Sequence, residues 1–219
     1  CYLMRCIANS CPVPSVQTVA SSFVPRHSAP SMERFEVAPL EHRALVAYLQ
    51  ERGIPAHIAK AKCKEAHYGV NGKSYFAVAF DNISGGWELR NRYFKGCRGL
   101  KDISYLPWSR DGPSTECTVF EGFIDYLSAL TLGIISGADA IILNSVVNVN
   151  KAVPYLKGYT ANNCYLDNDN AGQTALAELT AIYSSTVIDR STLYSEFNDL
   201  NDFLVNQSFT KNTLPNENK

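Results

Sequence analysis

Two aspartates stand one residue apart in the segment YLDNDNAG (165–172), at the point where an apolar stretch ends. At the end of a buried strand, Asp167 and Asp169 would repel each other unless a cation lay between them. Glu121 ends a second apolar stretch, CTVFEG. Carboxylates with no cysteine or histidine among them are hard oxygen ligands, which suit Mg²⁺ or Mn²⁺. The sequence therefore predicts a divalent-cation site and no zinc.

Three further aspartates extend this candidate metal-binding set. Asp125 follows Glu121 by one helical turn, and Asp199 and Asp202 stand at the start of the last predicted helix. Acids at a helix N-terminus also interact favourably with the helix dipole, so a capping role is an equal alternative for these last two. Divalent ions held by such carboxylates can bind the attacking and leaving oxygens of a phosphoryl transfer. The predicted chemistry is a metal-dependent reaction at phosphate.

The elements that must position these acids follow from an alternation of strand and helix patterns in the second half of the chain. The predicted strands cover 117–122, 140–145, 163–169 and 186–191, and the predicted helices cover 123–133, 150–159, 171–185 and 199–207. This alternation indicates an open, Rossmann-like α/β sheet of four largely parallel strands with flanking helices. Functional sites of such sheets lie at the carboxyl ends of the strands, so we expect the acids to converge there. Because side chains two apart on a strand share a face, Asp167 and Asp169 should point the same way.

A different pattern precedes this region and predicts an α+β subdomain. Helices are expected over 40–54 and 56–63, and strands over 66–70, 74–80 and 87–94. The Asn71-Gly72 pair between the first two strands is a strong hairpin signal. We therefore expect a small antiparallel sheet packed against the first helix.

Charge is divided unevenly along the chain. Residues 57–110 carry ten basic and four acidic side chains, whereas residues 111–219 carry five basic and thirteen acidic ones. A basic region next to an acidic one indicates a polyanionic partner beside a cation site. The candidate nucleic-acid or nucleotide-binding residues are Arg90, Arg92, Lys95, Arg98 and Lys101.

Two of these cations, Arg90 and Arg92, would project from the same face of the strand predicted over 87–94 and form a pair of forks for phosphates. Tyr93 and Phe94 stand among them and could stack on the bases of a single strand. Trp87 is better explained as a residue of the sheet core.

Seven cysteines without any CxxC pair argue against a disulfide scaffold and against a zinc ribbon. Cys1, Cys6 and Cys11 recur every five residues, and their role stays open. No apolar run approaches the roughly 18 residues of a membrane span, and the first thirty residues lack the apolar stretch of a secretory signal. We therefore expect a cytoplasmic protein that does not enter a membrane.

The segment VFEGFIDYLSAL, followed by YLDNDNAG, resembles the Toprim domain, which DnaG-type bacterial primases, type IA and II topoisomerases and certain nucleases share. That family pairs a strand-end glutamate with an Asp-x-Asp, as Glu121, Asp167 and Asp169 do here. The segment NDLNDFL (198–204) is similar to one that closes the site in the primase-like branch of bacterial mobile elements. Asn198 stands where that branch usually has a lysine.

The resemblance extends upstream, because YLQERGI and the segment 85–104 look like the accessory subdomain that precedes Toprim in DnaG-type primase cores. The zinc finger that such primases carry upstream is missing. The expected organisation is a flexible arm or linker at 1–38, a basic accessory subdomain at 39–112, a Toprim domain at 113–207 and a frayed tail at 208–219.

The resemblance implies a DNA primase-like nucleotidyltransferase that makes short RNA primers on a single-stranded DNA template from ribonucleoside triphosphates, in replication or mobilisation of a mobile element. Mg²⁺ or Mn²⁺ would be its cofactor, with Glu121 as general acid/base or metal ligand and Asp167 and Asp169 holding the metals. A replicative helicase or a relaxase would be its partner. Two alternatives stay open: a metal-dependent Toprim nuclease, and a non-catalytic single-stranded-DNA-binding mobilisation accessory.

Overall fold

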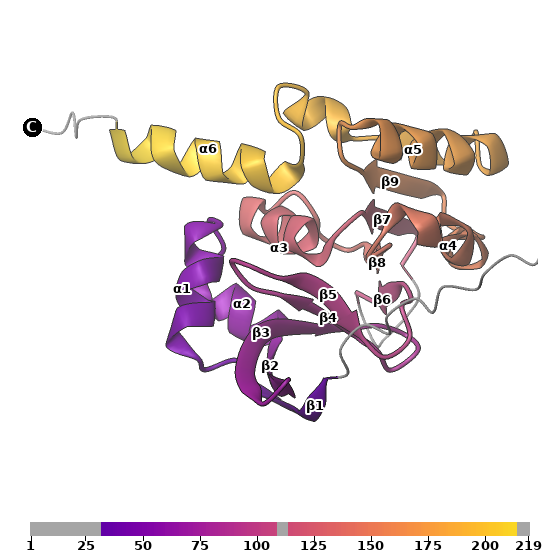
Figure 1. The fold of residues 1–219 in the computed structure, drawn as a ribbon. Coiled ribbons are helices and arrows are strands. Elements are labelled where there is room, and N and C mark those ends of the chain that lie inside the picture. Colours follow the sequence, from indigo (N-terminus) through magenta and orange to yellow (C-terminus); the bar gives the residue numbers. More distant parts are fainter. Residues whose placement is uncertain (1–31, 109–113, 214–219) are drawn as a thin grey trace, which may run out of the picture. The chain divides into compact units, whose positions relative to one another are not determined.

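The computed structural model describes residues 32–108 and 114–213, which form two β-sheets with helices (Figure 1). Cys1, Cys6, Cys11, most of the predicted arm and the end of the predicted tail lie outside the described residues. None of the helices in the described ranges has the length and apolar character that a membrane span requires.

The first sheet is antiparallel, with its five strands in the order β1-β2-β3-β4-β5. The strands are β1 (Glu33–Pro39), β2 (Lys64–Val70), β3 (Lys73–Asp81), β4 (Trp87–Arg90) and β5 (Lys95–Arg98), and two helices, α1 (Arg43–Glu51) and α2 (Ala56–Lys62), lie between β1 and β2 in the chain. Asn71 and Gly72 join β2 to β3 with φ angles of 51° and 74°, which confirms the predicted hairpin. The guanidinium carbon of Arg98 on β5 lies 5.7 Å from the ring centre of Phe35 on β1, so the two edge strands of the sheet approach each other.

Two predictions for this region were wrong. Residues 33–38 do not belong to an arm, because β1 pairs with β2 and its apolar residues Phe35 and Val37 pack against the buried cluster that contains Tyr68. The strand predicted over 87–94 ends at Arg90, where Asn91 starts a tight turn. In that turn the Asn91 N–H donates to the Phe94 carbonyl at 2.9 Å.

The second sheet has the order β10-β9-β7-β8-β6. Its strands are β6 (Ser104–Leu106), β7 (Glu116–Phe120), β8 (Asp139–Ile142), β9 (Ala161–Tyr165) and β10 (Val187–Asp189). The last four strands are parallel to one another, as predicted. The prediction of four strands missed β6, a three-residue strand that pairs antiparallel with β8 and lies in a stretch we assigned to the accessory subdomain.

Four α-helices follow these strands: α3 (Phe123–Leu132), α4 (Val149–Leu156), α5 (Asn170–Ile182) and α6 (Leu200–Thr213). Gly133 ends α3 with φ of 68°, the left-handed conformation of a glycine C-cap. The helix α6 continues to Thr213, so a frayed tail from residue 208 was wrong for its first six residues.

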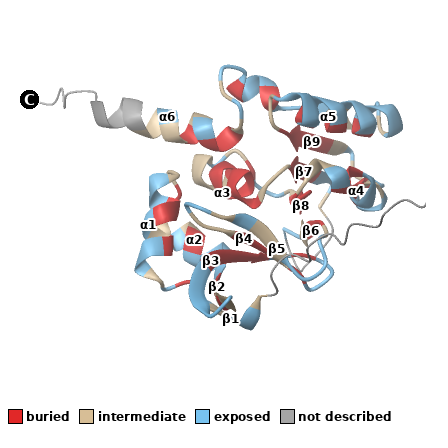
Figure 2. Cartoon of the chain, in the orientation of Figure 1, coloured by how far each residue is buried: buried red, intermediate tan, exposed pale blue. Residues whose placement is uncertain are grey.

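Successive residues of the parallel strands point to opposite faces of the sheet, and each face has its own helices. Phe120 and Ile142 pack with α3 and α6, whereas Val119 and Ile141 pack with α4 and α5. Figure 2 shows α3 as almost entirely buried, whereas α5 has a broad exposed face.

The core on the α3 side also contains residues of the first sheet and of α1 and α2. Phe80 of β3 stacks on Phe123 of α3, with ring centres 5.1 Å apart. This shared core holds the end of α1 next to the carboxyl edge of the second sheet.

Candidate active site

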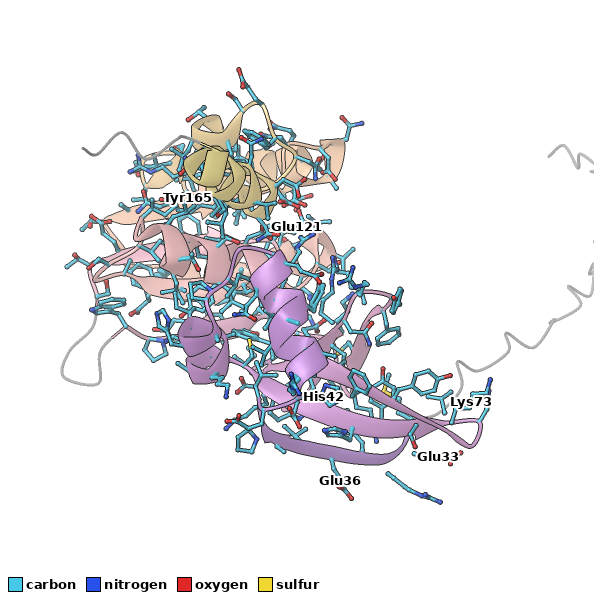
Figure 3. The ribbon with its side chains drawn as sticks, turned by 90° about the vertical axis from the view of Figure 1, so that its left-hand side faces the viewer. Glu33, Glu36, His42, Lys73, Glu121 and Tyr165 are labelled. Atoms are coloured by element: carbon cyan, nitrogen blue, oxygen red, sulfur yellow. The ribbon has the colours of Figure 1, made fainter. Side chains whose placement is uncertain are left out.

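Parallel pairing brings the ends of β7 and β9 to the same edge of the second sheet. Phe120, the last residue of β7, is the register partner of Tyr165, the last residue of β9. Glu121 and Asp167 therefore leave the sheet close together, one and two residues beyond their strands. Figure 3 shows Glu121 next to the C-terminal end of α1, whose other end lies at His42.

Four of the six predicted acids line one pocket of about 90 Å³, which we call the acidic pocket: Glu121, Asp125, Asp167 and Asp199. They come from the ends of β7 and β9, from the first turn of α3 and from the residue before α6. Its other wall includes residues of the accessory subdomain, Arg52, Glu88, Arg90 and Lys95. The acidic pocket therefore lies between acids that follow strands of the second sheet and cations of the accessory subdomain.

The other two predicted acids do not line the acidic pocket. Asp169 is the N-cap of α5, where its Oδ1 accepts hydrogen bonds from the Ala171 and Gly172 N–H groups at 2.8 Å. Asp202 is exposed in the first turn of α6, and its N–H donates to Asp199 Oδ1 at 2.7 Å. Asp199 thus caps α6 and lines the pocket as well.

The prediction that Asp167 and Asp169 share a strand face was wrong. β9 ends at Tyr165, so neither aspartate belongs to a strand and the two-residue period does not apply to them. Asp169 still acts on the site, since its charge follows burial as a cause of the raised pKa of Glu121.

Burial and like charges both raise the pKa values of the acids in the acidic pocket. Burial, followed by the charges of Asp125, Glu121 and Asp199, raises the pKa of Asp167 to about 8. Burial and the charge of Asp199 also raise the pKa of Asp125. The charge of Arg52 lowers the pKa of Asp125 and that of Lys95 lowers the pKa of Glu121, but burial and the neighbouring carboxylates outweigh both. A cation bound among these acids would favour their charged forms.

The acidic pocket fits a hard cation that substrate helps to hold. Glu121 Oε2 is buried without a hydrogen-bond partner, so it is available to coordinate a metal ion or to accept a hydrogen bond from a metal-bound water. Among the described residues, no three Asp, Glu, His or Cys side chains converge as a complete ligand set. Mg²⁺ typically binds one or two carboxylates and completes its shell with waters and substrate phosphates. The donor set therefore suits Mg²⁺ or Mn²⁺ and not a closed zinc site.

A larger basic pocket of about 500 Å³ adjoins the acidic one. Its lining residues are Tyr48, Glu51 and Arg52 from the end of α1, and Arg90, Asn91, Arg92, Tyr93, Phe94 and Lys95 from the turn between β4 and β5. Arg52, Arg90 and Lys95 line both pockets. The boundary between the two pockets is therefore a row of cations.

The five predicted phosphate-binding cations are divided in the structure. Arg90, Arg92 and Lys95 gather at the basic pocket, but Arg92 lies in the turn beyond β4 and forms an ion pair with Glu51. The expected pair of forks on one strand face was therefore wrong. Arg98 and Lys101 line neither pocket; Arg98 lies over the ring of Phe35.

Sequence reasoning missed three polar residues of the acidic pocket. Arg52 has a buried Nε without a hydrogen-bond partner, and Glu88 is a buried acid on β4. Asn144 follows β8 with a positive φ of 59° and is buried. Its Nδ2 donates to the Asp102 carbonyl at 2.8 Å and to Ser104 Oγ at 3.0 Å. A polar residue just beyond the end of a parallel strand was a usable signal for Asn144; none pointed to Arg52.

Two family models match separate parts of the chain. Residues 118–204 match a family model described as Toprim-like, and residues 34–99 match a domain of unknown function, DUF8464. No curated protein matches the chain significantly.

Solved structures are similar to the chain as well, among them the following three. The primase fragment of the bacteriophage T7 primase-helicase protein has 16% identity and a TM-score of 0.54, over 72% of this chain and 69% of that one. A chain from the complex of T7 lagging-strand DNA polymerase with primase domains of two gp4 subunits, bound to an RNA/DNA hybrid and dTTP, has 14% identity and a TM-score of 0.51, over 80% and 88%. The Aquifex aeolicus primase (zinc binding and RNA polymerase domains) has 14% identity and a TM-score of 0.45, over 78% and 57%. Residues 118–204 are therefore similar to Toprim-like domains, and the chain shares the fold of the T7 primase fragment.

Proposed function

We propose that this chain is a DNA primase-like nucleotidyltransferase, which synthesises short RNA primers on single-stranded DNA in replication or mobilisation of a mobile element. The observation that carries the proposal is the row of cations, Arg52, Arg90 and Lys95, that lines the acidic and the basic pocket together. Phosphoryl transfer depends on positioning and on neutralising charge, which needs carboxylates for metal ions beside cations for phosphates. The Toprim-like match and the primase fold support the same activity.

The acids take the roles that their positions allow. Asp167, Asp125 and Asp199 would supply the one or two carboxylates that Mg²⁺ or Mn²⁺ needs, and Glu121 would act as a further ligand or as general acid/base. When bound, the metal supplies positive charge to the phosphate oxygens of the substrate. Asp169 and Asp202 would support the site from its edge through their negative charge.

The cations would bind the substrates. Arg52, Arg90 and Lys95 are placed for a triphosphate that reaches from one pocket into the other. Arg92 and Tyr93 lie at the basic pocket, and Tyr93 is 90% exposed, so its ring is free to stack on a template base. The T7 complex contains primase domains bound to an RNA/DNA hybrid, which supports a nucleic-acid partner for this chain. A helicase or a relaxase would deliver the template.

The test is synthesis on single-stranded DNA with labelled ribonucleotides and Mg²⁺ or Mn²⁺. Short labelled products are expected from the parent and from Glu116→Gln, and none from Glu121→Gln or Asp167→Asn. Glu116 is the matched control because it lies at the other end of β7 and accepts a hydrogen bond from Asn163 Nδ2 at 3.2 Å. Equal activity in the parent and both site variants would contradict the assignment.

One observation favours a second candidate, a non-catalytic single-stranded-DNA-binding accessory: no three potential ligands converge among the described residues. Strand binding without labelled product or cleavage, under either metal, would support it. Metal-dependent cleavage of the template that Glu121→Gln abolishes would instead establish a nuclease.

A further inference from the structure

A buried asparagine links the accessory subdomain to the Toprim-like domain beside the acidic pocket. Asn201 lies in the first turn of α6 and is 0% exposed. Its Nδ2 donates to the carbonyl oxygen of Arg52 at 2.8 Å and to Ser128 Oγ at 2.9 Å. Its backbone N–H donates to Asp125 Oδ1 at 3.3 Å. One residue thus holds the end of α1 against two residues of α3, one of which is a proposed metal ligand.

The hydrogen bond from Asn201 to the Arg52 carbonyl fixes the backbone from which the Arg52 side chain extends. Arg52 lines both pockets, and its Nε is buried without a hydrogen-bond partner. Because the Arg52 Nε makes no hydrogen bond, the position of this long side chain depends on the Arg52 backbone. The carbonyl of that backbone is the group that Asn201 binds. Misplacing a substrate-binding group by about 1 Å can cost up to 10²-fold in activity.

A second buried asparagine shows what a purely structural role looks like. Asn162 of β9 is also 0% exposed, and its Nδ2 also donates to one backbone carbonyl and one hydroxyl, those of Leu156 and Thr186, at 3.4 and 3.0 Å. In both asparagines Oδ1 is buried without a partner. Asn162 lies near the start of β9, however, at the opposite end of the sheet from the acidic pocket.

We infer that Asn201 is a positioning residue: its side-chain amide sets the Arg52 guanidinium against Asp125, so that a polyphosphate anion is held across the boundary of the two pockets. The inference rests on the proposed function for the identity of that anion as the triphosphate of a nucleotide. Asn201 itself contacts no substrate and acts through Arg52.

The test is a double-mutant cycle on the binding of inorganic tripolyphosphate to the full chain in Mg²⁺, measured by titration calorimetry. Asn201→Ala and Arg52→Ala should each weaken binding about tenfold, within the range in which neighbouring groups couple. The double variant should bind no more weakly than Arg52→Ala alone, because the effect of Asn201 passes through Arg52. Asn162→Ala should lower the free energy of unfolding about as much as Asn201→Ala does, but it should leave the affinity for tripolyphosphate unchanged. Asn201→Ser replaces Asn201→Ala if the latter does not fold.

Three results would overturn the inference: additive losses in the double variant, an equal loss of affinity in Asn162→Ala, or unchanged affinity in Arg52→Ala. Primer synthesis by the parent is measured separately on the same protein. Absence of primers with a coupled cycle refutes the proposed function and keeps the positioning role. Primer synthesis together with additive losses in the cycle supports the proposed function and refutes the positioning role.

Discussion

Gly172 lies so close to Asp167 that a Cβ added to it would stand 2.1 Å from the Asp167 carbonyl oxygen and 3.0 Å from the Asp167 backbone nitrogen. The first turn of α5 therefore packs directly on the backbone that carries Asp167 into the acidic pocket. Asp169 caps the same turn. The glycine in YLDNDNAG is needed for this close approach, not for an unusual φ.

Gly172→Ala should therefore displace Asp167, because the atoms it meets are backbone and cannot rotate away. Overpacking of this kind costs about 1–3 kcal/mol of unfolding free energy, and any stabilisation by Mg²⁺ should fall with it. Gly69→Ala is the control, since its nearest neighbour would be at an ordinary 3.5 Å. Urea unfolding with and without Mg²⁺ measures both effects. A Gly172→Ala protein as stable as Gly69→Ala would contradict the packing argument.

Stability of the metal-free protein should fall as the pH rises from about 5 to 8. The folded-state pKa of Asp167 is raised to about 8, above the unfolded value of about 3.9, so the folded protein binds more protons in this range. The stabilisation is complete only below about pH 4 and is lost as pH passes through the folded pKa. Groups with lowered pKa, such as Glu65 and Asp139, act in the opposite direction at lower pH.

Urea unfolding in EDTA across this pH range measures the slope. Asp167→Asn should flatten it, because the amide does not titrate. A parent protein whose stability rises from pH 5 to 8 would show that the acids are compensated in some other way.

Mg²⁺ or Mn²⁺ should stabilise the folded protein at pH 8, by about 2.7 kcal/mol at a concentration 100 times its Kd. Asp167→Asn should remove most of this effect. Asp202→Asn should keep it, because Asp202 is exposed and lies outside the acidic pocket. Thermal unfolding over a range of metal concentrations decides the matter, and an equal loss in both variants would place Asp202 among the ligands after all.

Glu51→Gln should strengthen the binding of single-stranded DNA, because it releases Arg92 from its ion pair beside the basic pocket. Both partners are about half exposed, so a gain of up to about fivefold is expected from an ion pair of this class. One added phosphate contact should steepen the dependence of log K on log salt by about 0.7. Glu41→Gln, which breaks the exposed pair with Lys60, is the matched control. Identical salt slopes in the two variants would rule out a phosphate contact by Arg92.

Asn144→Ala should destabilise the protein more than Asn144→Gly does. Both variants lose the hydrogen bonds to Asp102 and Ser104, but only alanine is strained at a φ of 59°, by about 1 kcal/mol. The order should reverse at Asn148, which is also buried but has a φ of −92°. Chemical unfolding of the four variants tests this, and alanine equal to glycine at both positions would contradict it.

Local pattern was enough to predict most of the elements and the edge of the sheet at which the acids gather. Strand–helix alternation predicted the four parallel strands, Gly133 predicted the end of α3, and Asn71-Gly72 predicted the hairpin. Each of these signals acts within a few residues of chain, where side-chain period and backbone φ are set by the residues themselves.

Local pattern failed where a residue's role depended on a distant partner. The sequence of β1 contains only two apolar residues in alternation, and this pattern was too weak to predict that it pairs with β2. The strand β6 has only three residues, which is too short for a periodic pattern. Asp169 became a helix cap because β9 ends at Tyr165, four residues before the predicted end of this strand, and α5 starts directly after Asp169. These errors have one cause: where a strand or helix starts and ends depends on its neighbours in space.

The sequence by itself therefore determined which acids and cations were available and that parallel strands would bring the acids to one edge. Only the tertiary structure decided which of them face each other. Packing of α1 and β3 against α3 and α6 places Arg52 at the acidic pocket, although 69 residues separate it from Glu121 along the chain. A pocket between two subdomains depends on long-range packing, and a periodic pattern along the chain carries no information about it.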